Sequence, residues 1–175
     1  MFGGSGNEAE EAFEQFAASS WSRLRWSAYL LCGDHHLAED LAQTALARTY
    51  SAWGRVRRDD ALAYTRRTLV NLNIDRLRRR RPHEVGDGEL AGLGADPDSQ
   101  TEDRDEIVRL LQSLGEQERK VVVLRHYYDL PEAAVAAELG LPKGTVKSTL
   151  SRALAKLRVS AETPKLPQTS QGRTA

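Results

Sequence analysis

Apolar residues recur along most of this chain at the three- and four-residue spacing of an amphipathic helix, and no stretch sustains the two-residue alternation of a strand. The spacing predicts helices over residues 8–31, 35–53, 61–80, 104–114, 116–127, 131–139 and 143–158. In the first of these, a break around Ser19 and Ser20 is an open alternative. We therefore predict an all-α fold.

The last two predicted helices have the features of a helix-turn-helix. Gly140 suits a left-handed helix end, and Pro142 cannot continue the helix behind it. Ala136 is small where the helices would cross, and Val146 is an apolar anchor six residues after the glycine. The second helix has a polar face made of Lys143, Thr145, Lys147, Ser148, Ser151 and Arg152. Such donors suit phosphates and base edges in a major groove, although an ordinary helical hairpin with a solvated basic face remains the alternative.

The predicted helix over 61–80 is strongly basic and contains two asparagines. Its polar positions are Tyr64, Arg66, Arg67, Asn71, Asn73, Asp75, Arg76, Arg78 and Arg79. Asparagine offers a donor and an acceptor, aromatic rings stack on bases, and arginine binds the phosphate backbone. The pattern is typical of a surface that holds unstacked bases, with packing and capping roles for Tyr64 and Asn71 as the alternative.

Charge is unevenly distributed in a chain whose 25 basic and 25 acidic residues cancel. The run RLRRRR at 76–81 is followed by residues 82–103, which contain seven acids, four glycines, two prolines and no Lys or Arg. We predict two small helical domains, 8–81 and 104–160, a flexible acidic linker over 82–103 and a disordered tail over 161–175. A linker of 22 residues can span up to roughly 70 Å.

Other chemistry is sparse in this sequence. His35, His36, Glu39 and Asp40 have helical metal-ligand spacing, but nothing completes the site, and acids are favoured in a first helical turn. The single cysteine, Cys32, excludes an internal disulfide, fits a reducing compartment and reads as a small buried hydrophobe. No signal peptide or membrane span is apparent. We predict neither a metal nor a cofactor and no enzymatic activity.

Three segments in order resemble an RNA polymerase sigma factor of the extracytoplasmic-function type, in its actinobacterial SigE-like branch. LAEDLAQTALARTYSAW resembles the helix that binds the polymerase clamp, and YTRRTLVNLNIDRLRRRR resembles the minus-ten recognition helix of sigma region 2. SLGEQERKVVVLRHYYDLPEAAVAAELGLPKGTVKSTLSRALAKLR resembles sigma region 4, which binds the minus-thirty-five element. The resemblance covers about residues 8–160, so it includes both predicted domains and the linker.

The resemblance implies a role for each polar face. The residues expected to bind core polymerase are Glu39, Asp40, Leu41 and Gln43. Those expected at the minus-ten element are Tyr64, Arg67, Asn71, Asn73, Arg76, Arg78 and Arg79, with a flipped base held at Asn71. Those expected at the minus-thirty-five element are Lys143, Thr145, Lys147, Ser148, Ser151 and Arg152. Tyr64 stands where the family often has Trp, and Thr149 where it often has Arg, so these two contacts depart from the family pattern.

The implied function is promoter-specific transcription initiation with help in melting DNA. The implied partners are core RNA polymerase, through its clamp and flap, and promoter DNA, both duplex and melted, with an anti-sigma factor by analogy. We expect a cytoplasmic, nucleoid-associated protein without membrane insertion. The main alternative is a stand-alone helix-turn-helix regulator that binds duplex operator DNA, which leaves the first 80 residues unexplained. A metal-dependent enzyme and a protein-binding adaptor are weaker alternatives.

Overall fold

The computed structural model describes residues 4–80 and 101–162, and every regular element in these two ranges is helical. The elements are α1 (Gly4–Cys32), α2 (His35–Ser51), the 3₁₀ turn η1 (Arg58–Asp60), α3 (Ala61–Arg80), α4 (Thr101–Gln112), α5 (Glu116–Val122), the π-helix η2 (Val123–Tyr127), α6 (Glu132–Leu139) and α7 (Lys143–Glu162). The all-α prediction is confirmed. None of the described helices combines the length and apolar character that crossing a bilayer requires.

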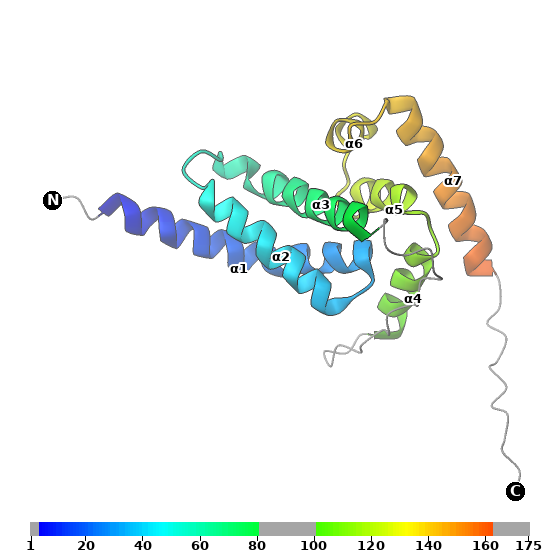
Figure 1. The fold of residues 1–175 in the computed structure, drawn as a ribbon, viewed down its shortest axis with the longest axis horizontal. Coiled ribbons are helices and arrows are strands. Elements are labelled where there is room, and N and C mark those ends of the chain that lie inside the picture. Colours follow the sequence, from blue (N-terminus) through cyan, green and yellow to red (C-terminus); the bar gives the residue numbers. More distant parts are fainter. Residues whose placement is uncertain (1–3, 81–100, 163–175) are drawn as a thin grey trace, which may run out of the picture.

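The N-terminal half consists of α1, α2 and α3, which pack side by side (Figure 1). Its core is formed by Leu24, Ala28 and Leu31 of α1, Ala38, Leu41, Ala42 and Ala45 of α2, and Leu69, Val70 and Leu72 of α3. Helix α1 continues through Ser19 and Ser20, so the alternative of a break there is wrong. The Ser19 hydroxyl donates to the Phe16 carbonyl at 3.0 Å, which satisfies this polar group within the helix.

Two residues make the sharp connection between α1 and α2. Gly33 has φ +71°, a left-handed conformation that glycine adopts without a steric penalty. Asp34 is the N-cap of α2, because its carboxylate accepts a hydrogen bond from the Leu37 N–H at 2.9 Å.

The C-terminal half consists of α4 to α7, and α6 and α7 form the predicted helix-turn-helix. Pro131 is the N-cap of α6, and Gly140 ends the helix with φ 64° and ψ 37°, the left-handed cap expected from the sequence. Val135 and Val146 are fully buried where the two helices meet. The predicted helix over 116–127 is instead a short α5 that widens into η2, where the Tyr128 N–H donates to the Val123 carbonyl at 3.2 Å.

Helix ends near the predicted linker and tail differ from the expectation. Helix α4 begins at Thr101, inside the predicted linker, and α7 runs to Glu162, beyond Arg158. Asp103 belonged to the acidic stretch that suggested a linker, but acids in a first turn also stabilise a helix N-terminus. The rest of the linker, 81–100, and most of the tail, 163–175, lie outside the described residues.

The two halves are docked against each other rather than standing apart. Helix α1 contacts both α4 and η2, and one continuous group of buried apolar side chains runs through both halves. In Figure 1, α5 lies beside the C-terminal end of α3, and α7 forms the side of the C-terminal half that is farthest from α1 and α2. The two halves are therefore packed together in one compact unit.

Candidate nucleic-acid interface

The outward face of α7 presents the polar residues expected on this helix. Lys143, Lys147, Ser148, Ser151 and Arg152 are exposed, and Thr145 is half-buried. The opposite face holds the helix in place, since Val146 and Ala153 are both 0% exposed. The face therefore offers hydroxyl and cationic donors on a rigid helix, as direct reading of a major groove requires.

The outward face of α3 carries a second polar row. Tyr64, Arg67 and Asn71 are exposed and follow one another at helical spacing on the same side of the helix. Arg78 and Arg79 extend the basic character toward the end of α3 and are also exposed, whereas Arg76 is half-buried. This row combines an aromatic ring, an amide and guanidinium groups, which together suit a nucleic-acid strand with unpaired bases.

A hollow of about 690 Å³ opens beside Tyr64 and Arg67. Its other lining residues are Ala52, Arg55, Val56, Arg57, Asp60 and Ala63. They belong to the connection between α2 and α3 and to the first turn of α3. Residues 55–60 lie between two predicted helices and were assigned no role from the sequence, although the arginines on either side of Val56 were a usable signal.

The walls of this hollow are fixed by buried contacts. The hydroxyl oxygens of Thr49 and Thr65 lie 2.8 Å apart and join α2 to α3. The Trp53 indole N–H donates to the Ala9 carbonyl at 3.0 Å, and the Arg58 guanidinium lies 5.2 Å from the Trp53 ring centroid. The connecting loop is therefore anchored to α1, and the hollow is a standing feature of the N-terminal half.

Asn73 is placed differently from the expectation. Its side chain is 2% exposed, and its Oδ1 has no hydrogen-bond partner among the described residues. A buried carbonyl of this kind is costly, on the order of 1–3 kcal/mol. In this arrangement Asn73 cannot reach a nucleic acid, so we leave it out of the interface proposed below.

The expected polymerase-binding residues of α2 divide into two groups. Asp40 and Gln43 are exposed, and Glu39 is half-buried with its carboxylate 3.5 Å from the Arg25 guanidinium. Leu41 is 6% exposed and packs in the core, so it supports the helix and is not available to a partner.

His35 and Cys32 take part in packing contacts. The His35 ring stacks on Tyr29, with centroids 3.8 Å apart, and no group of three or more ligand-type side chains that could hold a metal ion occurs in residues 4–80 and 101–162. Burial raises the pKa of the Cys32 thiol to about 11, and its Sγ lies 3.3 Å from the Asp34 carbonyl oxygen. A neutral, hydrogen-bonded thiol is a packing group rather than a nucleophile.

An ion pair between the halves joins Arg66, which the sequence placed on the polar face of its helix, to Glu138, which was not selected from the sequence. Arg66 of α3 donates to the carboxylate of Glu138 in α6, with a shortest distance of 2.8 Å. The signal for Glu138 was its position as an acid near the end of a helix that is otherwise mostly Ala, Val and Leu.

Comparison with known proteins gives this geometry its context. Residues 19–83 match the family model for Sigma-70 region 2, and residues 104–157 match that for Sigma-70, region 4. The chain is 40% identical to the RNA polymerase sigma-E factor of Streptomyces avermitilis over 152 residues, which are 86% of this chain and 85% of the relative. The chain belongs to the sigma factor family. The sigma-E factor of Streptomyces coelicolor is 41% identical, over 83% of this chain and 84% of that protein.

Membership of this family identifies the function of the chain. The chain is a sigma factor of the extracytoplasmic-function type that directs RNA polymerase to initiate transcription, and the stand-alone regulator is not favoured. The resemblance to the actinobacterial SigE-like branch is confirmed. A more distant relative is the ECF RNA polymerase sigma factor SigM of Mycobacterium tuberculosis, 32% identical over 83% of this chain and 75% of that protein. Sigma factors are initiation factors, which agrees with the expectation of a non-enzyme.

Solved structures agree on the fold. The sigma factor RpoE of Bartonella quintana, in complex with the anti-sigma factor NepR, superimposes with a TM-score of 0.70 at 22% identity, over 86% of this chain and 98% of that one. CnrH in complex with the cytosolic domain of CnrY gives a TM-score of 0.61 at 22% identity, over 89% of this chain and 96% of that one.

Proposed function

We propose that the polar faces of α3 and α7 divide promoter recognition between them. The observation that carries this proposal is the presence of one exposed polar face in each half, each matching a different sigma region. The α7 face, with Lys147, Ser148 and Ser151 at its centre, would read the minus-thirty-five duplex through the major groove. Lys143, Thr145 and Arg152 would contact phosphates at its edges.

The α3 face would hold the melted minus-ten strand. An extruded base costs a few kcal/mol of lost stacking and pairing, which a fitted hollow can offset. The hollow beside Tyr64 offers a ring for stacking, and Arg67 at its rim offers a phosphate contact. Asn71, one turn further along α3, lies on the same side and would read the edge of a flipped base. Arg76, Arg78 and Arg79 would follow the backbone.

The exposed side of α2 would bind the clamp of core polymerase through Asp40 and Gln43, with Glu39 beside them. Region 4 would rest on the polymerase flap. Binding both halves to one large partner raises the effective concentration of each DNA contact, so neither half needs high affinity alone. With these partners, the site of action would be the cytoplasm, at the nucleoid.

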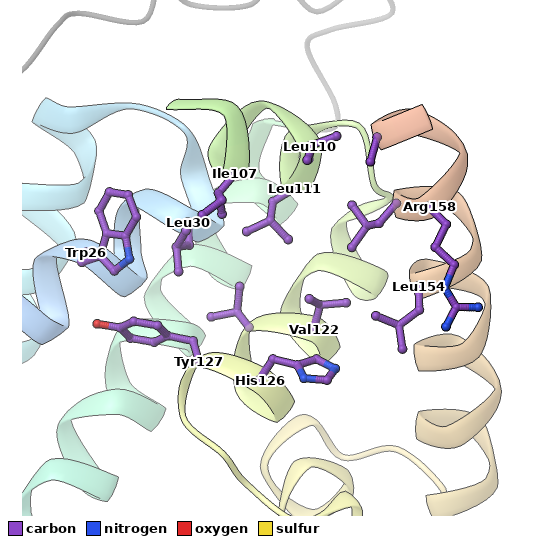
Figure 2. Close-up of a pocket in the computed structure, with 13 residues that line it drawn as sticks. Trp26, Leu30, Ile107, Leu110, Leu111, Val122, His126, Tyr127, Leu154 and Arg158 are labelled. Carbon is purple, nitrogen blue, oxygen red and sulfur yellow. The ribbon is translucent and has the colours of Figure 1, made fainter. Parts of the chain in front are cut away.

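An anti-sigma factor is the further partner that we propose. Both solved structures named above are complexes in which a sigma factor is bound by a second protein. This chain has an apolar groove of about 590 Å³ lined by both halves, with Trp26 and Leu30 on one side and Leu154 and Arg158 on the other (Figure 2). Leu110 and Leu111 of α4 and Val122 lie between them. An apolar helix laid in this groove would hold the halves together and away from polymerase.

Run-off transcription tests the proposed function directly. Purified core RNA polymerase would be incubated with and without the chain on a pool of genomic promoter fragments. We expect discrete new start sites that depend on the chain, with shared sequences upstream that define its two elements. No chain-dependent start, together with tight binding to duplex DNA without polymerase, would support the stand-alone regulator instead.

A further inference from the structure

The contact between Arg66 and Glu138 is a buried two-point ion pair. Arg66 Nε lies 3.1 and 3.2 Å from the two carboxylate oxygens, and Nη2 lies 2.8 Å from Oε2. The Arg66 and Glu138 side chains are 9% and 2% exposed. Arg67 Nε lies 3.7 Å from the same carboxylate. One acid of the helix-turn-helix therefore engages two neighbouring arginines of α3.

One aromatic ring, that of Tyr128, packs against this ion pair. The guanidinium carbons of Arg66 and Arg23 lie 5.1 and 5.2 Å from the Tyr128 ring centroid. The Tyr128 hydroxyl and the Ser27 hydroxyl lie 2.6 Å apart in a buried hydrogen bond. Tyr128 thus joins α1 to the Arg66–Glu138 pair, so α1, α3 and α6 are held together at this point.

A second point of docking lies at the end of α1. The Arg119 guanidinium donates to the Leu31 carbonyl at 2.8 Å and to carbonyls of Leu111, Gln112 and Leu114. Gln112 also donates to the Leu30 carbonyl at 3.3 Å. The docked arrangement therefore rests on polar contacts at both ends of the interface, and the Arg66–Glu138 pair is the one that involves the proposed minus-ten helix.

This arrangement brings the two proposed DNA-binding faces too close together for a promoter. Glu138 precedes Lys143, the first residue of α7, by only five residues, which span at most roughly 18 Å. The start of the recognition helix therefore lies within a few tens of ångströms of Arg66. Two promoter elements about two duplex turns apart are separated by roughly 70 Å. The halves must separate before both elements can be bound.

The carboxylate of Glu138 also occupies groups that would otherwise serve a phosphate. Arginine binds carboxylates and phosphates through the same parallel pair of N–H donors. Arg67 lines the hollow proposed for a flipped base, together with Tyr64, and Arg66 precedes Arg67 on α3. In addition, Arg78 lines a cavity of about 260 Å³ that also includes Glu116 and Lys120 of the C-terminal half.

We propose that Glu138 is an autoinhibitory clasp. In the free chain it holds the helix-turn-helix half on α3, takes the place of a DNA phosphate at Arg66 and Arg67, and keeps the two DNA-binding faces from spanning a promoter. Core polymerase, by binding the two halves apart, releases the clasp. Free chain is thereby kept from engaging DNA without polymerase.

The first test is small-angle scattering of the free chain and of Glu138→Gln. Removing the charge leaves Arg66 buried without its counter-ion, which is strongly unfavourable unless the halves open. A compact chain of this length has a radius of gyration of about 16 Å, and we expect Glu138→Gln to raise the measured radius clearly above that of the wild type. Glu132→Gln, the same change at the other end of α6, is the matched control and should leave it unchanged.

The second test measures binding to a labelled 30-base-pair duplex of random sequence, without polymerase, over a range of salt. Each arginine released to a phosphate should add about 0.9 to the slope of log K against log salt. Glu138→Gln should therefore bind more tightly with a steeper slope, whereas Glu132→Gln, with the same net charge, should match the wild type. Equal slopes and equal radii for the two variants would overturn the clasp.

A double-mutant cycle separates opening from loss of structure. Arg66→Gln alone should also open the chain, but Arg66→Gln/Glu138→Gln contains no unpaired buried charge at this point and should close again. Circular dichroism must show unchanged helix content in all variants. A double variant whose radius of gyration increases by the sum of the two single-variant increases would contradict a clasp made by this pair. The run-off assay is independent of these results, so a failed clasp leaves the sigma factor function intact.

Discussion

Two glycines with left-handed backbones differ in what surrounds them. Gly33 and Gly140 have φ +71° and +64°. A Cβ at Gly33 would lie 2.8 Å from Gln112 Cδ, across the interface between the halves, whereas a Cβ at Gly140 would meet nothing within 4 Å. The first glycine is therefore needed for both conformation and close approach, and the second for conformation alone.

This difference predicts unequal costs for the same substitution. Gly140→Ala should lower the free energy of unfolding by about 1–2 kcal/mol, the cost of a left-handed backbone at a residue with a Cβ. Gly33→Ala should cost more, because Gln112 must also move and its hydrogen bond to Leu30 is disturbed. Urea unfolding of both variants measures the free energy of unfolding. Equal decreases for the two variants would show that Gln112 does not pack closely against Gly33.

The single cysteine offers a chemical measurement at the residue scale. The raised pKa of Cys32, about 11, leaves roughly a hundredfold less thiolate at pH 8 than an ordinary thiol has. Labelling with a maleimide at pH 8 should therefore be about a hundredfold slower in the folded chain than in urea, and it should accelerate as the pH rises toward 11. Labelling at equal rates in the two states would mean that the thiol is not held in this environment.

At the scale of elements, α3 shows how far the sequence alone could lead. Periodicity correctly predicted this helix and its mixture of arginines and asparagines. It could not assign the faces, because α3 is polar on more than one side and a second half of the molecule covers one of them. Arg66 is buried for that reason, since it contacts Glu138 and Tyr128 and only 7% of the whole residue is exposed. Asn73 is also buried, with 2% exposure, although both residue types suggested the surface. The shape of the hollow beside Tyr64 could not be predicted either, since it depends on how the connection between α2 and α3 packs against α1.

The exposed row of α3 predicts a defect in opening rather than in initial binding. Asn71→Ala should leave stability unchanged, because the side chain is exposed. It should reduce promoter opening about 5- to 150-fold, which corresponds to the loss of a base contact of about 1–3 kcal/mol. Permanganate reactivity of the melted strand measures opening, and gel shift of the closed complex measures binding. Normal opening with weakened closed-complex binding would remove Asn71 from the proposed base contact.

Two lysines on α7 provide a matched pair. Lys147 is exposed on the proposed DNA face, whereas Lys156 lies 2.9 Å from the Glu118 carboxylate and lowers the pKa of that group. Lys147→Ala should weaken binding to minus-thirty-five duplex and reduce the salt slope by about 0.9. Lys156→Ala should leave the slope unchanged. Fluorescence anisotropy over a salt series checks both, and an unchanged slope for Lys147→Ala would exclude a phosphate contact there.

At the scale of the whole molecule, the docked halves create surface that neither half has alone. The apolar groove of Figure 2 is lined by α1 on one side and α7 on the other. It exists only while the halves are together, so a partner that fills it stabilises the docked form by mass action. The same docking that buries Arg66 thus forms the surface that we assign to an anti-sigma factor.

An acidic residue placed in the groove should block binding of the anti-sigma factor and leave binding to polymerase intact. Ile107 is 48% exposed and lines the groove, so Ile107→Asp should be tolerated in folding but should repel an apolar helix. A protein that copurifies with the chain and suppresses its run-off transcription should lose that suppression against Ile107→Asp. Val159→Asp is the control, since Val159 is 66% exposed and is not part of the groove lining. Suppression that survives Ile107→Asp would place the anti-sigma factor elsewhere.

The π-helix η2 has a consequence for comparing relatives of this chain. Its wide turn carries one residue more than an α-helical turn between Val123 and Tyr128. A full turn of a π-helix uses about one residue more than a full turn of an α-helix, so the loss of one residue from 123–127 as an α turn forms would leave the following residues facing the same way. A change from π to α at constant length would instead rotate them by about 100°, and Tyr128 would turn away from Ser27. We therefore expect a relative that lacks one residue at this point to be able to keep the docking of the two halves.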